Sequence, residues 1–105
     1  MNCTVRFHVD TERDFAKWIH GNDVRRGSHP AITEALIDEL ISELKASEGN
    51  PIGAFFVPQL QPPRWVWRFS SDTWISYILR TKRTGLFGSV TLEVIVLSIA
   101  SEQPA

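Results

Sequence analysis

The chain is poor in the residues that most often carry chemistry at a protein site. Its single cysteine, Cys3, excludes an internal disulfide bond and suits a reducing compartment, so we expect a cytoplasmic protein. The histidines are scattered, and no CxxC or HExxH spacing occurs, so we expect no metal site. No phosphate-binding loop or dinucleotide fingerprint is present, and we therefore expect no cofactor.

Long apolar runs are also missing. The longest fall well short of the ~20 residues that a membrane-spanning helix needs, and no basic stretch followed by an apolar run resembles a signal peptide. We therefore expect no contact with a membrane. With 105 residues, 43% of them hydrophobic and 22% charged, the composition predicts a single folded domain over residues 1–105.

The charge is small but uneven. The net charge is −1, too little to attract nucleic acid to the whole molecule. Residues 1–52 contain six Lys or Arg and nine Asp or Glu, whereas residues 53–105 contain five and three. An anion-binding surface is therefore expected in the second half, unless the difference only reflects an acidic helix face.

The spacing of apolar residues changes along the chain. Cys3 to Val9 alternates with a period of two, which predicts a half-buried edge strand. Apolar residues in Phe15 to Ile19 predict a short helix, and those from Ile32 to Leu44 predict an amphipathic helix of about four turns. The two helices together predict a helical hairpin.

The second half is typical of strands. Arg64 to Ser70, Trp74 to Arg80 and Val90 to Ala100 each predict a strand, with a further short strand near residue 55. Thr81 to Gly88 is predicted to be a loop. The expected fold is thus an α+β domain with an N-terminal strand, a helical hairpin and an antiparallel sheet of three to four strands.

The predicted sheet has two different faces. The aromatic residues of the strand at 64–70 alternate, and this pattern predicts packing against the helices. We expect Arg64, Arg68 and Tyr77 on the opposite, open face. Guanidinium groups there could hold phosphates, and neighbouring rings could stack bases. The alternative is a set of solvated arginines that keeps an exposed sheet soluble.

In the order of its elements the chain resembles the RelE/ParE toxin superfamily. The residues that carry the resemblance are Trp67-Arg68-Phe69, Ser71-Asp72, Trp74 to Leu79 and Val94 to Ile99. They are similar to an arginine-bearing strand, a turn, a strand with a tyrosine and the strand that follows in that family. The resemblance implies the toxin-like component of a toxin–antitoxin system, with a cognate antitoxin as its partner.

An active member would be a ribosome-dependent mRNA endoribonuclease that stabilises the developing phosphoryl charge without a metal. The residues assigned to catalysis are Arg68, Tyr77, Arg80 and Arg83. Those assigned to RNA binding are Arg64 and Lys82. The implied targets are the ribosome with its mRNA or, for a ParE-like member, DNA gyrase. A homodimer could cover the apolar sheet.

The chain also departs from the family pattern. Ser70 and Ser71 stand where the family commonly has glycine, and Trp74 stands where it commonly has arginine. The last predicted strand runs into Ser98 to Glu102 without the His, Arg and Tyr that ribonuclease members tend to carry there. Two alternatives therefore stay open. One is a non-enzymatic protein-interaction module, either a ParE-like target inhibitor or an inactive toxin homologue. The other is a small-ligand-binding domain unrelated to toxins.

Overall fold

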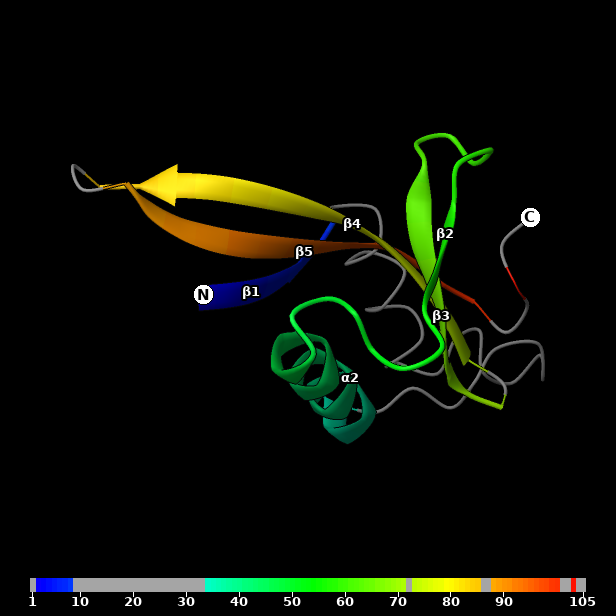
Figure 1. Ribbon diagram of the computed structural model, residues 1–105. Coiled ribbons are helices and arrows are strands. Elements are labelled where there is room, and N and C mark those ends of the chain that lie inside the picture. The colour runs from blue at the N-terminus through cyan, green and yellow to red at the C-terminus, as the bar shows by residue number, and fades with distance from the viewer. Residues whose placement is uncertain (1, 9–33, 72, 86–87, 101–102, 104–105) are drawn as a thin grey trace.

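The computed structural model describes residues 2–8, 34–71, 73–85, 88–100 and 103. These residues form a five-stranded sheet and one helix, α2 (Figure 1). The helix spans Glu34–Ala46. The strands are β1 (Asn2–Phe7), β2 (Phe55–Val57), β3 (Arg64–Ser70), β4 (Thr73–Thr84) and β5 (Ser89–Ala100). They lie side by side in the order β1-β5-β4-β3-β2.

The predicted α+β layout, with its helical hairpin and antiparallel sheet, is wrong. The described residues form a mixed sheet with a single helix, because β1 runs parallel to β5 while the other neighbouring pairs are antiparallel. The first predicted helix, Phe15 to Ile19, lies outside the described residues. Alternation along a strand indicates which side chains share a face, but it carries no information on the strand's direction or neighbour.

Single strands were predicted better than their arrangement. The strand at Arg64–Ser70 is confirmed as β3, and the short strand near residue 55 is confirmed as β2. The predicted loop at Thr81 to Gly88 is wrong in its first half, since β4 continues to Thr84. Its polar residues resemble a loop in sequence, yet they pair with β5 in a regular antiparallel register, for example Thr81 with Leu92.

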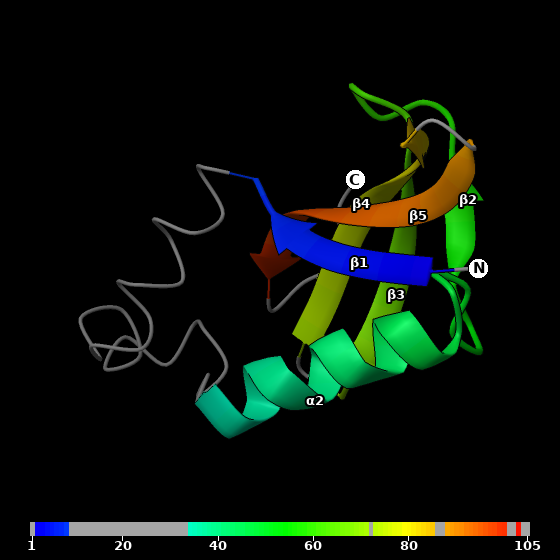
Figure 2. The ribbon, with the colours of Figure 1, turned by 90° about the vertical axis from the view of Figure 1, so that its left-hand side faces the viewer.

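The core lies between α2 and one face of the sheet (Figure 2). Leu40 and Leu44, one helical turn apart, are 1% and 0% exposed. They pack with buried side chains of three neighbouring strands: Trp67, Ile75, Tyr77, Val94, Val96 and Ile99. The prediction that the aromatic face of β3 packs on a helix is confirmed, because Trp67 belongs to this cluster and Trp65 and Phe69 pack against it.

A tight turn after α2 closes this core. The amide of Gly49 donates to the carbonyl of Leu44 at 2.8 Å, which ends the helix. Gly49 has a φ of 76°. A Cβ atom on it would stand 2.5 Å from Cδ2 of Leu79. Both the backbone angle and the close packing against β4 therefore require glycine here.

Strands β4 and β5 are each 12 residues long and reach beyond the other strands. Pairing between β3 and β4 ends at Trp65 and Tyr77, and pairing between β1 and β5 begins at Asn2 and Thr91. The far ends of β4 and β5 project from the body of the molecule (Figure 1), and we call their paired residues 78–84 and 89–95 the ribbon. Strand β1 runs beside β5 as far as Thr91, so among the described residues only 83–84 and 89–90 form a purely two-stranded tip.

Candidate functional site

Tyr77 lies in the core and not on the open face. Its side chain is fully buried, and its hydroxyl donates to the carbonyl of Gly49 at 2.8 Å. Burial raises the pKa of the Tyr77 phenol well above its ordinary range. The expectation that Tyr77 accompanies the arginines on the open face is wrong. Its alternation with Ile75 and Leu79, both apolar, was the sequence signal for a core position.

Arg64 holds a loop in place. Its Nε donates to the carbonyl of Pro62 at 3.0 Å and its Nη2 to the carbonyl of Gln61 at 2.8 Å. Its Nη1 donates to Oγ of Ser76 at 3.4 Å. These contacts fasten the segment between β2 and β3 to β4. They occupy three of the nitrogen donors that the RNA-binding role would use.

Arg68, on β3, lies beside the opposite end of β4 from Arg80, Lys82 and Arg83. Its Cζ stands 5.6 Å from the ring centroid of Trp74, and its Nη2 donates to the carbonyl of Ser71 at 2.8 Å. Arg68 pairs with Trp74, whereas Arg80 lies six residues further along the strand. At a rise of about 3.4 Å per residue, this separation is on the order of 20 Å.

Arg80, Lys82 and Arg83 are all exposed on the far half of β4. Alternation places Arg80 and Lys82 on one face of the ribbon and Arg83 on the other. The structure therefore brings three of the six predicted residues to one segment. It does not bring Arg64, Arg68 or Tyr77 to them, so the described geometry assembles no catalytic group from the predicted set.

The sequence reasoning missed Glu93, which lies beside Arg80, and Arg6, which pairs with Glu93 from its other side. Glu93 of β5 has Oε2 at 3.3 Å from Nε of Arg6 and Oε1 at 3.5 Å from Nε of Arg80. The second contact is purely Coulombic, because among the described residues Oε1 has no hydrogen-bond partner. Glu93 thus links β1, β5 and β4. The sequence held no signal for this link, since it depends on the parallel pairing of β1 with β5.

The same segment of β4 has an unpaired backbone edge. Within the described part of the chain, no strand pairs with Ile78 to Thr84 on the side away from β5. We call this side of residues 78–84 the β4 edge. An edge of this kind presents backbone N–H and C=O groups to solvent. Here it is flanked by the exposed cations of Arg80, Lys82 and Arg83.

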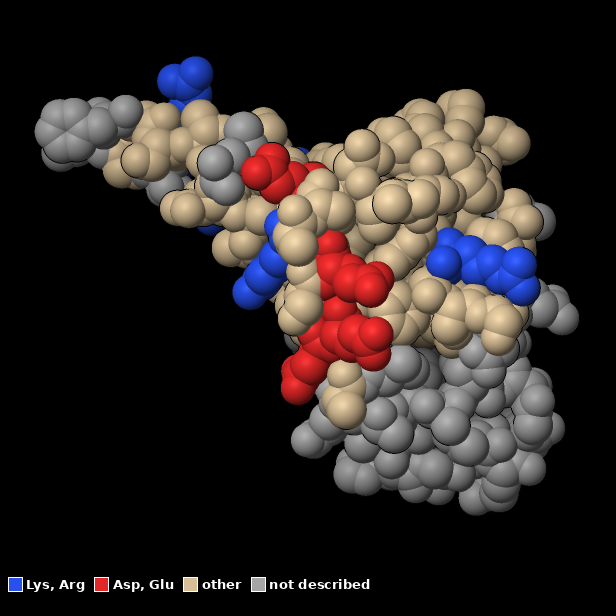
Figure 3. Space-filling view, turned by 60° about the horizontal axis from the view of Figure 1, so that its bottom comes forward, with Lys and Arg blue, Asp and Glu red and all other residues tan. Residues whose placement is uncertain are grey.

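The acidic residues lie elsewhere. Asp38, Glu39 and Glu43 are exposed on α2. Figure 3 shows acidic side chains gathered near the centre of this view, with cationic side chains on the projecting ribbon, beside the acidic group and on the side of the body opposite the ribbon. The acidic residues of α2 and the basic residues within 80–83 of β4 thus lie on different parts of the described structure.

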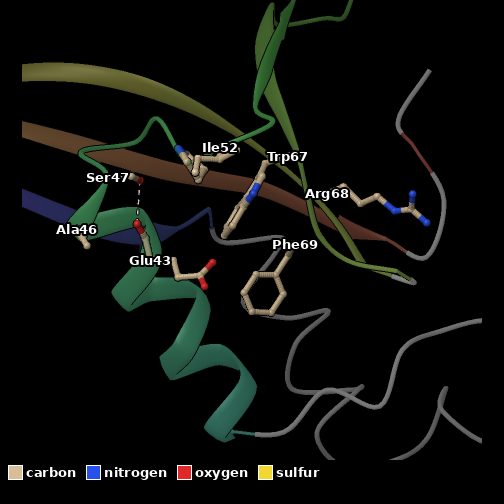
Figure 4. A pocket seen from close by; sticks show the side chains of 8 residues that line it. Glu43, Ala46, Ser47, Ile52, Trp67, Arg68 and Phe69 are labelled. Carbon is tan, nitrogen blue, oxygen red and sulfur yellow. Dashed lines mark hydrogen bonds between the residues drawn. The ribbon is translucent and has the colours of Figure 1, made fainter.

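A hollow of about 520 Å³ lies between the C-terminal end of α2, the loop after it and β3 (Figure 4). It is lined by Glu43, Ala46, Ser47, Pro51, Ile52, Trp67, Arg68 and Phe69. The guanidinium of Arg68 points away from it, and the carboxylate of Glu43 points toward Phe69 (Figure 4). The hollow is therefore apolar with one acidic wall.

Other kinds of site have less support. In residues 2–8, 34–71, 73–85, 88–100 and 103, no three His, Cys, Asp or Glu side chains gather as metal ligands. The pKa of the Cys3 thiol is raised, first by burial and then by the nearby Glu48, which disfavours the reactive thiolate. No helix in the described part of the chain has the length and apolar character to cross a membrane.

Comparison with protein-family models found no match to this chain. Searches of curated proteins and of solved structures found no significant match either.

Proposed function

We propose that this protein is a non-enzymatic interaction module that binds an extended acidic segment of a partner protein as an added strand along the β4 edge. The observation that carries the proposal is the stretch from Ile78 to Thr84, which no described strand pairs with on the side away from β5 and which carries three exposed cations. Addition of a strand to an open sheet edge is a recurrent mode of peptide recognition.

The backbone supplies the affinity in this mode. Each new ladder hydrogen bond contributes a net ~0.5–1.5 kcal/mol, and the β4 edge is long enough to form several. The ribbon is already ordered by β5, which pairs with β4 as far as Thr84 and Ser89. Binding therefore requires the partner segment to become ordered but not the backbone of the ribbon, in addition to the translational and rotational entropy that every association loses.

The charges supply the selectivity. If two copies of the chain paired through the β4 edge, Arg80, Lys82 and Arg83 of one copy would face the same cations of the other. Like charges on neighbouring strands are destabilising, so the edge disfavours self-association. A segment that carries carboxylates gains the opposite interaction, and its binding should weaken as salt is added.

An endoribonuclease activity has weaker support. Tyr77, one of the residues assigned to catalysis, is buried in the core, and its hydroxyl donates to the carbonyl of Gly49. The guanidinium groups of Arg68 and Arg64 donate hydrogen bonds to backbone carbonyls of the neighbouring loops. A toxin role stays a prediction that a growth test can decide. If induced expression leaves bacterial growth unchanged, the active-toxin hypothesis is wrong.

The proposal is tested by NMR titration with two synthetic peptides. One alternates glutamate with valine over seven residues, and its counterpart alternates lysine with valine. We expect the acidic peptide to shift the backbone amide signals of residues 78–84 and the lysine peptide to leave them unchanged. The variant Lys82→Glu should weaken acidic-peptide binding, and Lys45→Glu, an equally exposed charge reversal on α2, should not.

Three outcomes would overturn the proposal. One is equal binding of both peptides, and another is signal shifts confined to residues outside the ribbon. The third is tighter binding of a single-stranded oligonucleotide than of the acidic peptide at the same salt concentration, which would assign the ribbon to nucleic acid instead.

A further inference from the structure

We infer that the hollow between α2 and β3 binds an alkylammonium group, such as the side chain of lysine or methylated lysine, from a basic partner segment. The hollow lies apart from the β4 edge, because its described lining residues belong to α2, the loop after it and β3 (Figure 4). The inference is therefore independent of the strand-addition proposal.

Two aromatic rings form a corner of the hollow. The ring centroids of Trp67 and Phe69 are 5.2 Å apart, and their planes meet at 80°. Trp67 is only 4% exposed, so the core holds its ring rigidly, and the residue is also one of those that line the hollow. An ammonium group is attracted to the face of an aromatic ring within about 6 Å of its centroid.

One carboxylate completes the corner. The side chain of Glu43 points toward Phe69 (Figure 4). Among the described residues no cation forms an ion pair with this carboxylate. The hydroxyl of Ser47 donates to the backbone carbonyl of Glu43 at 2.8 Å and leaves the carboxylate available.

Arg68, the one cation among the described residues of the lining, does not neutralise the hollow. Its guanidinium points away (Figure 4), and Trp74 and the carbonyl of Ser71 hold it there. The described lining therefore offers aromatic rings and a negative charge. This chemistry excludes anionic ligands and suits a cation with apolar substituents.

The rim suits the aliphatic stem of a lysine. Ala46, Pro51 and Ile52 border the hollow, and Ile52 is 100% exposed. Apolar atoms of this kind can cover the methylene groups of a long side chain while its charged end lies beside the carboxylate. Asp38 and Glu39, exposed on the same helix, add negative charge that would attract a basic segment.

The test uses small probes that differ in charge. Butyltrimethylammonium and butylammonium represent methylated and unmodified lysine, and 1-butanol is the neutral control. Binding is followed through the indole N–H signal of Trp67 and the amide signals of residues 43–52 on titration of the full chain. We expect both cations to shift these signals and butanol to shift them far less.

Two substitutions assign the contacts. Glu43→Gln should weaken cation binding about two- to fivefold, the effect of losing one modest electrostatic contact. Glu39→Gln, also on the exposed surface of α2, should change it less. Phe69→Leu keeps an apolar side chain but removes the ring, and should also weaken binding. Circular dichroism verifies that each variant is folded.

The inference is overturned if butanol binds as well as the cations, since the hollow is then merely apolar. It is equally overturned if Glu43→Gln leaves the affinity for butyltrimethylammonium unchanged, or if the cations shift only signals remote from residues 43–52 and 67–69. None of these readouts involves residues 78–84. Failure of this inference would therefore not contradict the proposed strand addition at the β4 edge, and failure of strand addition would not contradict this inference.

Discussion

The two halves of β4 belong to one continuous strand but lie in different surroundings. Thr73 to Tyr77 runs between β3 and β5, and four of its five side chains are buried. From Ile78 to Thr84 the strand has β5 as its one described neighbour, and Arg80 to Arg83 are exposed. The number of neighbouring strands, and not the strand conformation, separates the part that stabilises the fold from the part available to a partner.

The largest expected difference between the halves is in stability. Ile75→Ala removes a fully buried side chain in the first half and should lower the free energy of unfolding by about 3–4 kcal/mol. Ile78→Ala removes the same atoms from a half-buried position and should cost about 1 kcal/mol. Urea unfolding followed by tryptophan fluorescence measures both. Equal losses would contradict the proposed division of the strand.

A second comparison concerns the turn after α2, where Gly49 packs against Leu79, close to the point at which the two halves of β4 meet. Gly49→Ala should lower the free energy of unfolding by about 2–4 kcal/mol, because the new Cβ meets Leu79 and the φ is unfavourable. Gly53 is the matched control, since its φ is 89° and nothing lies within 4 Å of a Cβ there. Gly53→Ala should cost only the backbone strain, about 1–2 kcal/mol. Urea unfolding of both variants separates steric overlap from strain.

Tyr77, the last residue of the buried half, makes a prediction about pH. It is the single tyrosine of the chain, so absorbance of the phenolate reports it alone. Because its pKa is raised in the folded state, its contribution to stability is complete below pH ~10, where the unfolded tyrosine is still protonated. Stability should fall as the pH rises above that value. We expect phenolate absorbance to appear only together with unfolding.

Tyr77→Phe gives the control for this titration. The variant leaves the carbonyl of Gly49 without its donor and should lose about 1–1.5 kcal/mol at neutral pH. Its loss of stability above pH 10 should be smaller than that of the wild type. A phenolate signal in the folded wild-type protein at pH 10 would show that the hydroxyl is accessible.

The smallest effect is expected on the ribbon. Glu93→Gln removes a charge shared by Arg6 and Arg80, both of which are about half exposed, so the free energy of unfolding should change by less than about 1 kcal/mol. The variant makes the ribbon more positive. It should therefore bind the acidic peptide more tightly than the wild type in the NMR titration. Weaker binding would show that Glu93 positions Arg80 for the partner.

Local features of this protein followed from short stretches of sequence. The alternation in Arg64 to Ser70 indicated both the strand and its buried aromatic face, and the four-residue spacing of Leu40 and Leu44 indicated the helix that covers it. These are properties of side-chain period, which depends on the local backbone alone. Applied to Ile75, Tyr77 and Leu79, the same two-residue period would have predicted that Tyr77 lies in the core and not in the candidate site.

Which strands become neighbours was decided only in three dimensions. Asn2 to Phe7 and Thr91 to Val96 are far apart in the chain, and their parallel pairing alone brings Arg6 to Glu93. Among the described strands, the β4 edge is likewise open because the pairing of β4 with the shorter β3 stops at Trp65 and Tyr77. Amino-acid order determined the period, charge and burial of each segment. Pairing between distant segments depends on the packing of the whole core. It decided which backbone hydrogen-bonding groups and which charged side chains stay accessible to a partner.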